Sequence, residues 1–322
     1  MASHHIYWWN LENLFDIERS SNRSEFLQKS LKSELKGWTR AILNKKLFNL
    51  NSIIVQFNNN LGPDILGVCE VESKAVVEEL ADRMSTSLNR RYEVSHADSD
   101  DKRGIDTALI YDKDLYSSED LIFTLRITKR NSTRDLLQFH LKTQSDNELV
   151  IILNHWPSRS GGTFESEPYR IMVAENLAYW VDRIHEEMEG KPSIVLMGDF
   201  NDNPFDRSLS QYLMGSNNKK GVSYARNYKF YNLMFQFMDK QVGTHVYGSE
   251  LNLLDQFLIS KSILSNSSSY PFKYESCNIL LMPELVKGRY NTPIRFGRPS
   301  SKLNLDGYSD HLPIELVLSE RD

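Results

Sequence analysis

The 322-residue sequence contains little cysteine and no long apolar run. Its two cysteines, Cys69 and Cys277, lie far apart, and nothing around them resembles a metal-ligand cluster or a disulfide-stabilised scaffold. The longest apolar runs, at 149–153 and 194–197, are much shorter than the ~20 residues of a transmembrane helix. A reducing compartment is the simplest interpretation, and we expect no transmembrane segment.

The N-terminus also lacks the features of a signal peptide. Residues 1–5 lead directly into the apolar segment 6–9, without a basic region, a long apolar segment or a small-residue cleavage site. Together with the cysteine pattern, this predicts a cytoplasmic location.

Positive charge is not in excess, because 38 Lys and Arg residues stand against 43 Asp and Glu residues, for a net charge of −5. This balance argues against a protein that coats nucleic acid through charge alone. It leaves open an enzyme that contacts a few phosphates through a metal ion. With 40% hydrophobic and 25% charged residues, the composition is that of a globular protein with a sizeable core.

Three amphipathic segments predict helices. The first helix is predicted over 27–42, where apolar residues recur at three- and four-residue spacing: Leu27, Leu31, Leu35, Trp38 and Ile42. The others are predicted over 73–84 and over 166–189, the latter with Ser166 as its N-cap.

Short apolar segments between these helices predict strands. They lie at 6–9, 64–69, 92–96, 107–111, 122–127, 136–143, 149–154, 193–198, 254–259 and 312–318. No internal repeat and no low-complexity linker divides the chain. Helices interleaved with many strands therefore predict a single domain over 1–322 built from layered sheets and helices.

Polar residues stand at the ends of five predicted strands, where a strand fixes a side chain and a loop exposes it. These residues are Asn10 and Glu12, Glu70, His155, Asp199 and Asn201, and Asp310 and His311. Carboxylate and amide oxygens suit Mg²⁺ or Mn²⁺, which retain water molecules for a substrate phosphate. Histidines suit hydrogen bonding to a phosphate oxygen. Zinc is disfavoured, because no HExxH or Cys/His spacing occurs.

Seven segments, in order, carry a resemblance to a known family. They are WNLENLF (9–15), GVCEV (67–71), RGIDTALIY (103–111), NHWPSR (154–159), GDFND (198–202), LDQF (254–257) and SDHLP (309–313). The set resembles the endonuclease/exonuclease/phosphatase superfamily, which includes deoxyribonuclease I, exonuclease III, abasic-site endonucleases, neutral sphingomyelinases and inositol polyphosphate 5-phosphatases. The resemblance runs from residue 6 to residue 318.

This resemblance implies an α+β fold, a four-layer αββα sandwich in which two packed mixed β-sheets are flanked by helices. It also implies an active site at one edge of the sheets and Mg²⁺-dependent hydrolysis of a phosphate ester, with Mn²⁺ as a possible substitute. On the metal side, Glu70 resembles the principal carboxylate ligand, Asn10 an orienting or metal-proximal amide, and Asp310 a metal-side or orienting carboxylate. Glu12 matches either a second acidic ligand or a surface residue of a turn.

On the phosphate side, Asp199 resembles the general base that activates water, and Asn201 the group that holds the phosphate in the transition state. His311 resembles the histidine at the phosphate, paired here with Asp255. Such a carboxylate fixes the tautomer and raises the imidazole pKa toward the charged form, which stabilises phosphoryl oxygens better. His155 is a candidate general acid, with a structural histidine below Trp156 as the alternative.

Two arginines are candidate phosphate contacts, because a guanidinium matches phosphate geometry. They are Arg103, for which a solvated or salt-bridged loop residue is an equal alternative, and Arg159, for which that alternative is favoured. Further basic residues offer a local basic rim: Lys129, Arg130, Arg134, Arg295, Arg298 and Lys302.

Substrate choice does not follow from the fold. A nuclease acting on DNA or RNA through local, metal-centred contacts is the first interpretation. A phosphomonoesterase of the inositol polyphosphate type would require a concentrated Lys/Arg pocket. A sphingomyelinase would require a membrane-facing surface, for which only Tyr270 and Phe272 are candidate exposed aromatics. An inactive adaptor is disfavoured, because none of the expected site positions is missing.

Overall fold

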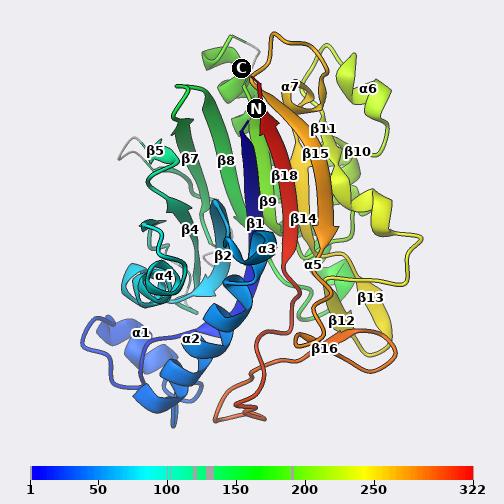
Figure 1. The fold of residues 1–322 in the computed structure, drawn as a ribbon. Coiled ribbons are helices and arrows are strands. Elements are labelled where there is room, and N and C mark those ends of the chain that lie inside the picture. The colour runs from blue at the N-terminus through cyan, green and yellow to red at the C-terminus, as the bar shows by residue number, and fades with distance from the viewer. Residues whose placement is uncertain are drawn as a thin grey trace.

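The computed structural model describes residues 2–99, 101, 103–118, 122–127, 134–189 and 192–321. Two β-sheets stack face to face, with helices outside them (Figure 1). The six-stranded sheet has the order β15 (Phe272–Ile279), β18 (Ile314–Glu320), β1 (Ser3–Leu14), β2 (Ile65–Val71), β4 (Asp106–Asp112) and β3 (Tyr92–His96). Its central pair, β1 and β2, is parallel, and the other neighbours are antiparallel.

The eight-stranded sheet is also mixed. Its order is β10 (Gly215–Ser216), β11 (Phe230–Asn232), β14 (Asp255–Ile259), β9 (Ile194–Asp199), β8 (Glu148–His155), β7 (Leu136–Thr143) and β5 (Tyr116–Ser118), with β6 (Phe123–Leu125) paired to β7. Strands β8 and β9 run parallel, and β14 runs antiparallel to β9.

Strand β8 shows how the sequence divides into layers. Its odd residues Leu149, Ile151 and Leu153 join the core between the sheets. Its even residues Val150 and Ile152 pack instead in the core under helix α5 (Thr163–Glu187). Because side chains alternate between the two faces of a strand, a continuous apolar run is what a strand buried on both faces requires.

Helices α2 (Arg40–Ile54) and α4 (Lys74–Leu88) lie against the six-stranded sheet, and α5 covers the eight-stranded one. The predicted αββα sandwich of two mixed sheets flanked by helices is therefore confirmed. The shorter elements are α1 (Glu25–Ser30), α3 (Phe57–Asn60), α6 (Lys219–Ser223), α7 (Lys261–Leu264), η1 (Ser208–Tyr212), η2 (Leu233–Phe237), and the hairpins β12 (His245–Tyr247) with β13 (Glu250–Asn252) and β16 (Val286–Lys287) with β17 (Thr292–Pro293).

The helix predicted over 27–42 is wrong. Helix α1 ends at Ser30, and the chain turns through Gly37, whose φ of +83° suits glycine. Thr39 then caps α2 by accepting from the Ile42 amide. The periodic apolar residues reflect burial around Trp38 in a small separate core rather than one continuous helix.

Helix α5 begins earlier than predicted. Its N-cap is Gly162, and Ser166 lies inside the first turn, where its hydroxyl donates to the Gly162 carbonyl at 2.6 Å. Ser166 therefore does not cap the helix, which ends at Glu187 rather than Glu189.

The structure also corrects the predicted strand at 122–127 and the predicted exposure of Phe272. Of the strand predicted over 122–127, only Phe123–Leu125 forms a strand, and Lys129 and Arg130 lie outside the described residues. Phe272 is fully buried at the start of β15, so it is not an exposed aromatic. None of the helices in the described ranges is both long and apolar enough to span a bilayer.

Gly67 in β2 sits where the two sheets touch. A Cβ there would lie 2.6 Å from Met197 Cε of β9 and 2.9 Å from Trp8 Cε3 of β1. Overpacking of this kind costs about 1–3 kcal/mol. We expect Gly67→Ala to lower the free energy of unfolding in urea by that amount. In a Met197→Ala background the same substitution should cost less, because the nearest clash is gone; an equal cost in both backgrounds would contradict this packing.

Candidate functional site

The polar residues predicted at strand ends converge because of strand direction. Asn10 of β1 pairs with Cys69 of the parallel strand β2, directly before Glu70, and the parallel strands β8 and β9 end together at His155 and Asp199. The antiparallel strands β14 and β18 start at the same edge, so that Asp255 pairs with Asp199 in register. Asp310 and His311 precede β18, which runs antiparallel to β1. Both sheets therefore contribute to one site.

Asp255 and His311 form a buried pair. His311 Nδ1 lies 2.6 Å from Asp255 Oδ2, and the other carboxylate oxygen accepts from the Trp8 indole at 2.9 Å. Burial opposes a charged imidazole, but Asp255 and then Asp199 outweigh it and raise the pKa of His311 well above its ordinary value. Its Nε2 lies 3.8 Å from Asp199 Oδ2. A charged His311 thus faces Asp199.

Asp199 is held by two donors. The Asn201 amide donates to Oδ1 at 2.9 Å, and Asn10 Nδ2 donates to Oδ2 at 3.1 Å. Burial raises the pKa of Asp199 to about 6, because the loss of water outweighs these bonds and the charge of His311. Its carboxylate is therefore ionised but basic at neutral pH, as an acceptor for a proton from water must be.

His155 lies between two carboxylates. Its Nε2 is 3.9 Å from Glu70 Oε1 and 3.9 Å from Asp199 Oδ2. Burial, and then the charges of Arg134 and Arg103, lower the pKa of His155 well below its ordinary value. Its buried Nδ1 has no hydrogen-bond partner among the described residues. His155 is thus a neutral imidazole directed at the two carboxylates.

Glu70 and Asp310 lie in a region of concentrated negative charge. Glu70 has a φ of +60°, and its Oε2 accepts from the Asn13 amide at 2.9 Å. Burial, and then Glu12 and Glu70, raise the pKa of Asp310 to about 7. Crowded carboxylates of this kind are stabilised by a bound cation. Hard oxygen donors fit a divalent ion such as Mg²⁺.

Glu12 is occupied by other protein groups. Its carboxylate accepts from Arg295 Nε at 2.8 Å and Nη2 at 2.7 Å, and from the amides of Phe296 at 2.8 Å and Gly297 at 3.2 Å. Lys46 also donates to its carbonyl oxygen. Glu12 therefore ties the segment 295–297 to the end of β1, and a role as metal ligand would require Arg295 to move away.

Among the described residues, the potential ligand atoms of Asp199, Asp255 and His311 lie within 4.8 Å of one another. A cation there would displace the hydrogen bond between Asp255 and His311, and the positive charge of His311 would repel it. Proton transfer fits this trio better than metal binding, which leaves Glu70 and Asp310 as the better metal candidates. A second such group, His96, Asp98 and Asp106, lies on β3, the following loop and β4.

Of the two predicted phosphate contacts, Arg103 lies exposed beside the site, where its charge acts on His155. Arg134, assigned from the sequence only to a basic rim, lowers the pKa of His155 more than Arg103 does. It is buried, its Nη1 donates to the Trp156 carbonyl at 3.3 Å, and its Nε lies 3.6 Å from Asp101 Oδ2 without forming a hydrogen bond. Burial, and then Arg103, lower its pKa. No sequence signal separates Arg134 from other loop arginines.

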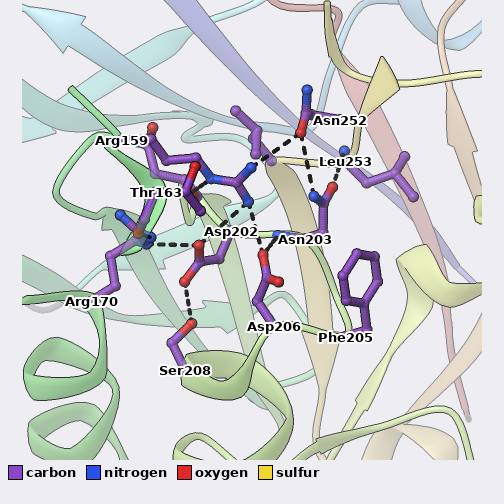
Figure 2. A network of polar contacts seen from close by, with 12 residues as sticks. Arg159, Thr163, Arg170, Asp202, Asn203, Phe205, Asp206, Ser208, Asn252 and Leu253 are labelled. Carbon is purple, nitrogen blue, oxygen red and sulfur yellow. Dashed lines mark hydrogen bonds and ion pairs between the residues drawn. The ribbon is translucent and has the colours of Figure 1, made fainter. Parts of the chain in front are cut away.

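Arg159 is directed into the protein instead. It donates to the Asn201 carbonyl, and Figure 2 shows its contacts with the side chains of Asp202, Asp206 and Asn252. Beside this network lies an open hollow of about 300 Å³, lined among others by Asn203, Phe205, Met238 and Leu253.

The family model for the endonuclease/exonuclease/phosphatase family matches residues 5–320. The comparison with curated protein sequences gives no match. Among solved structures, the human Nocturnin catalytic domain with bound sulfate is 15% identical, with a TM-score of 0.54 over 99% of this chain and 95% of that one.

Two other solved structures share the fold. D. rerio TDP2 complexed with a single-strand DNA product is 12% identical, with a TM-score of 0.56 over 99% of this chain and 100% of that one. A mannosyl-6-phosphatase from Bacteroides thetaiotaomicron is 16% identical, with a TM-score of 0.55 over 98% and 99%. With the family model spanning nearly its whole length, the chain belongs to the endonuclease/exonuclease/phosphatase family, whose members are phosphoesterases.

Proposed function

We propose that this protein is a Mg²⁺-dependent phosphodiesterase, a nuclease that hydrolyses DNA or RNA by in-line attack of water on phosphorus. The observation that carries the proposal is the approach of His311 Nε2 to within 3.8 Å of Asp199 Oδ2. A carboxylate that can accept a proton thus stands beside an imidazolium that can donate hydrogen bonds. Hydrolysis requires both groups in one place: the carboxylate to accept a proton from the attacking water, and the imidazolium to donate a hydrogen bond to a phosphoryl oxygen.

Different residues of the chain activate the water and bind the phosphoryl group. Asp199 accepts the proton of the attacking water. Asn201 donates one side-chain N–H to the Trp156 carbonyl at 3.1 Å, which leaves its second N–H for a phosphoryl oxygen. His311 donates to the same phosphoryl group, and Arg134 adds positive charge nearby.

Glu70 and Asp310 would hold the divalent ion, with Asn10 orienting Asp199 beside it. The bound ion supplies charge neutralisation at the phosphoryl oxygens. Mn²⁺ offers similar preferences for oxygen ligands and should replace Mg²⁺. His155, a neutral imidazole with Nε2 3.9 Å from both Glu70 and Asp199, can donate or accept one hydrogen bond to the substrate.

A single phosphate suits the available positive charge better than a polyphosphate does. Arg159 and Arg295 are engaged with carboxylates, and Arg170 pairs with Asp202 at 2.7 Å. The charges of Arg103 and of Arg134, which lies 3.6 Å from Asp101, act on His155. A dense basic pocket for an inositol polyphosphate is absent from the described part of the site, and the burial of Phe272 weakens the case for a membrane-binding sphingomyelinase.

A substrate panel tests this proposal. With Mg²⁺ present, we expect hydrolysis of DNA or RNA and of a chromogenic phosphodiester, but little of the matching monoester. Chelation should abolish the activity, and Mg²⁺ or Mn²⁺ should restore it. Activity on monoesters or sugar phosphates alone would replace the nuclease by a phosphatase, and inactivity on the whole panel would favour a non-catalytic protein.

The pH profile should report Asp199. Because its carboxylate must be ionised to accept a proton and its pKa is raised to about 6, kcat/KM should rise tenfold per pH unit below 6 and level off above it. Asp199→Asn should reduce kcat by about 10²–10⁴-fold with an unchanged unfolding midpoint. A flat profile between pH 5 and 7 would rule out Asp199 as the base.

Asp255 should keep His311 charged at neutral pH. In the wild type, NMR titration of the His311 ring should show protonation through pH 7, because the pKa is raised. In Asp255→Asn the negative partner is lost, so the pKa should fall and the ring should become neutral at a lower pH. Unchanged titration in the variant would show that Asp255 does not set the charge of His311.

A further inference from the structure

Arg159 follows β8, and its guanidinium is spread over four acceptors, three in the loop after β9 and one in the β12–β13 hairpin. Figure 2 shows the side-chain acceptors Asp202, Asp206 and Asn252. Nε donates to the Asn201 carbonyl at 2.8 Å, and Nη2 donates to Asp206 Oδ2 at 2.8 Å and to Asp202 Oδ1 at 3.4 Å. Nη1 donates to Asn252 Oδ1 at 3.3 Å. These bonds use four of the five N–H groups of an arginine, which leaves little for a substrate phosphate.

Asn201, the residue that Arg159 contacts through its backbone, is in an unusual conformation. Its φ is +52°, in the left-handed region that asparagine tolerates better than most residues. Its amide donates to Asp199 Oδ1 and its Nδ2 to the Trp156 carbonyl. With Arg159 on its carbonyl oxygen, Asn201 is fixed at three separate atoms: the backbone nitrogen, the carbonyl oxygen and Nδ2.

The partners of Arg159 are themselves fixed. Asp202 accepts from Ser208 Oγ at 2.6 Å and lies 2.7 Å from Arg170 Nε, deep in the protein. Arg170 in turn donates to the Thr163 carbonyl at 3.1 Å, at the start of α5. The frame around Arg159 is therefore rigid on the α5 side.

The other side of the frame reaches the strand that carries Asp255. Asp206 accepts from the Asn203 amide at 2.7 Å, and Asn203 Oδ1 accepts from the Leu253 amide at 2.8 Å. Leu253 is two residues before Asp255. A shift of the 201–206 loop would therefore displace both Asn201 and the segment that leads to Asp255. Arg159 joins the two halves of this frame through its bonds to Asp202, Asp206 and Asn252.

We propose that Arg159 is a positioning residue, which holds Asn201 in its left-handed conformation and so directs the Asn201 amide at the phosphoryl group. The proposal rests on the proposed function of the site. Arg159 acts through Asn201 and does not itself bind the substrate phosphate.

The test uses the full-length protein and a double-mutant cycle. Lysine keeps the charge of arginine but cannot span the four acceptors. We expect Arg159→Lys to lower kcat on a phosphodiester about 10-fold, with KM within twofold of the wild type. Combined with Asn201→Ala, Arg159→Lys should cause no further loss, because the two residues act through one amide.

Other outcomes would overturn the proposal. A rise in KM that adds fully to the effect of Asn201→Ala would show direct phosphate binding by Arg159. A lower unfolding midpoint with unchanged kcat would show a purely structural role. Arg207→Lys, at an exposed arginine paired with Glu167 outside this frame, is the matched control and should match the wild type.

A second readout does not depend on activity. Amide hydrogen exchange by NMR should be at least 10-fold faster at Asn201 in Arg159→Lys, with the Phe200 amide, bonded to the Leu254 carbonyl, unchanged. Unchanged exchange at Asn201 would refute the positioning role even if the wild type proves inactive on every phosphoester. Asp206→Asn removes one charged partner of Arg159 and should also make amide exchange at Asn201 faster. This variant replaces Arg159→Lys in the experiment if Arg159→Lys does not fold.

Discussion

The register of three neighbouring strands is the constraint on which the site depends. His155 pairs with Asp199, and Asp255 pairs with Asp199 on the other side. Residues paired directly across strands hold their side chains within a few ångströms of each other. A slip of one residue would turn each side chain to the opposite face. Gly198, where an added Cβ would lie 2.2 Å from the Asn154 carbonyl oxygen, helps to keep β8 and β9 in close contact at this row.

Burial gives these residues their chemistry, and it does so in opposite directions. The same loss of water raises the pKa of Asp199 to about 6 and lowers that of His155 well below its ordinary value. His311 escapes this effect because Asp255 lies against its Nδ1. Two histidines in one site therefore differ in charge for a local reason, the presence or absence of a carboxylate within hydrogen-bond distance.

Much of this could be predicted from the sequence, because strand ends and short motifs are local features. The edge that carries Glu70, Asp199 and His311 follows from apolar runs that end in polar residues. Helix boundaries were less predictable, since the apolar spacing around Trp38 reflects burial from several directions and Gly37 breaks the helix. The partners of Glu12 could not be predicted, because Arg295 lies 283 residues away in the sequence and no local pattern joins them.

Arginine is the clearest case in which residue type alone misleads. A guanidinium suits a phosphate and a carboxylate equally well, so the choice depends on which oxygen lies nearer in the fold. Arg159, Arg170 and Arg295 lie within 2.8 Å of carboxylates from distant segments, whereas buried Arg134 lies 3.6 Å from Asp101 with its Nε free of hydrogen bonds, and its charge acts on His155. The net charge of −5 therefore says little about the positive charge that a substrate meets. That charge is local, because most of the arginines around the site are already neutralised by the protein's own carboxylates.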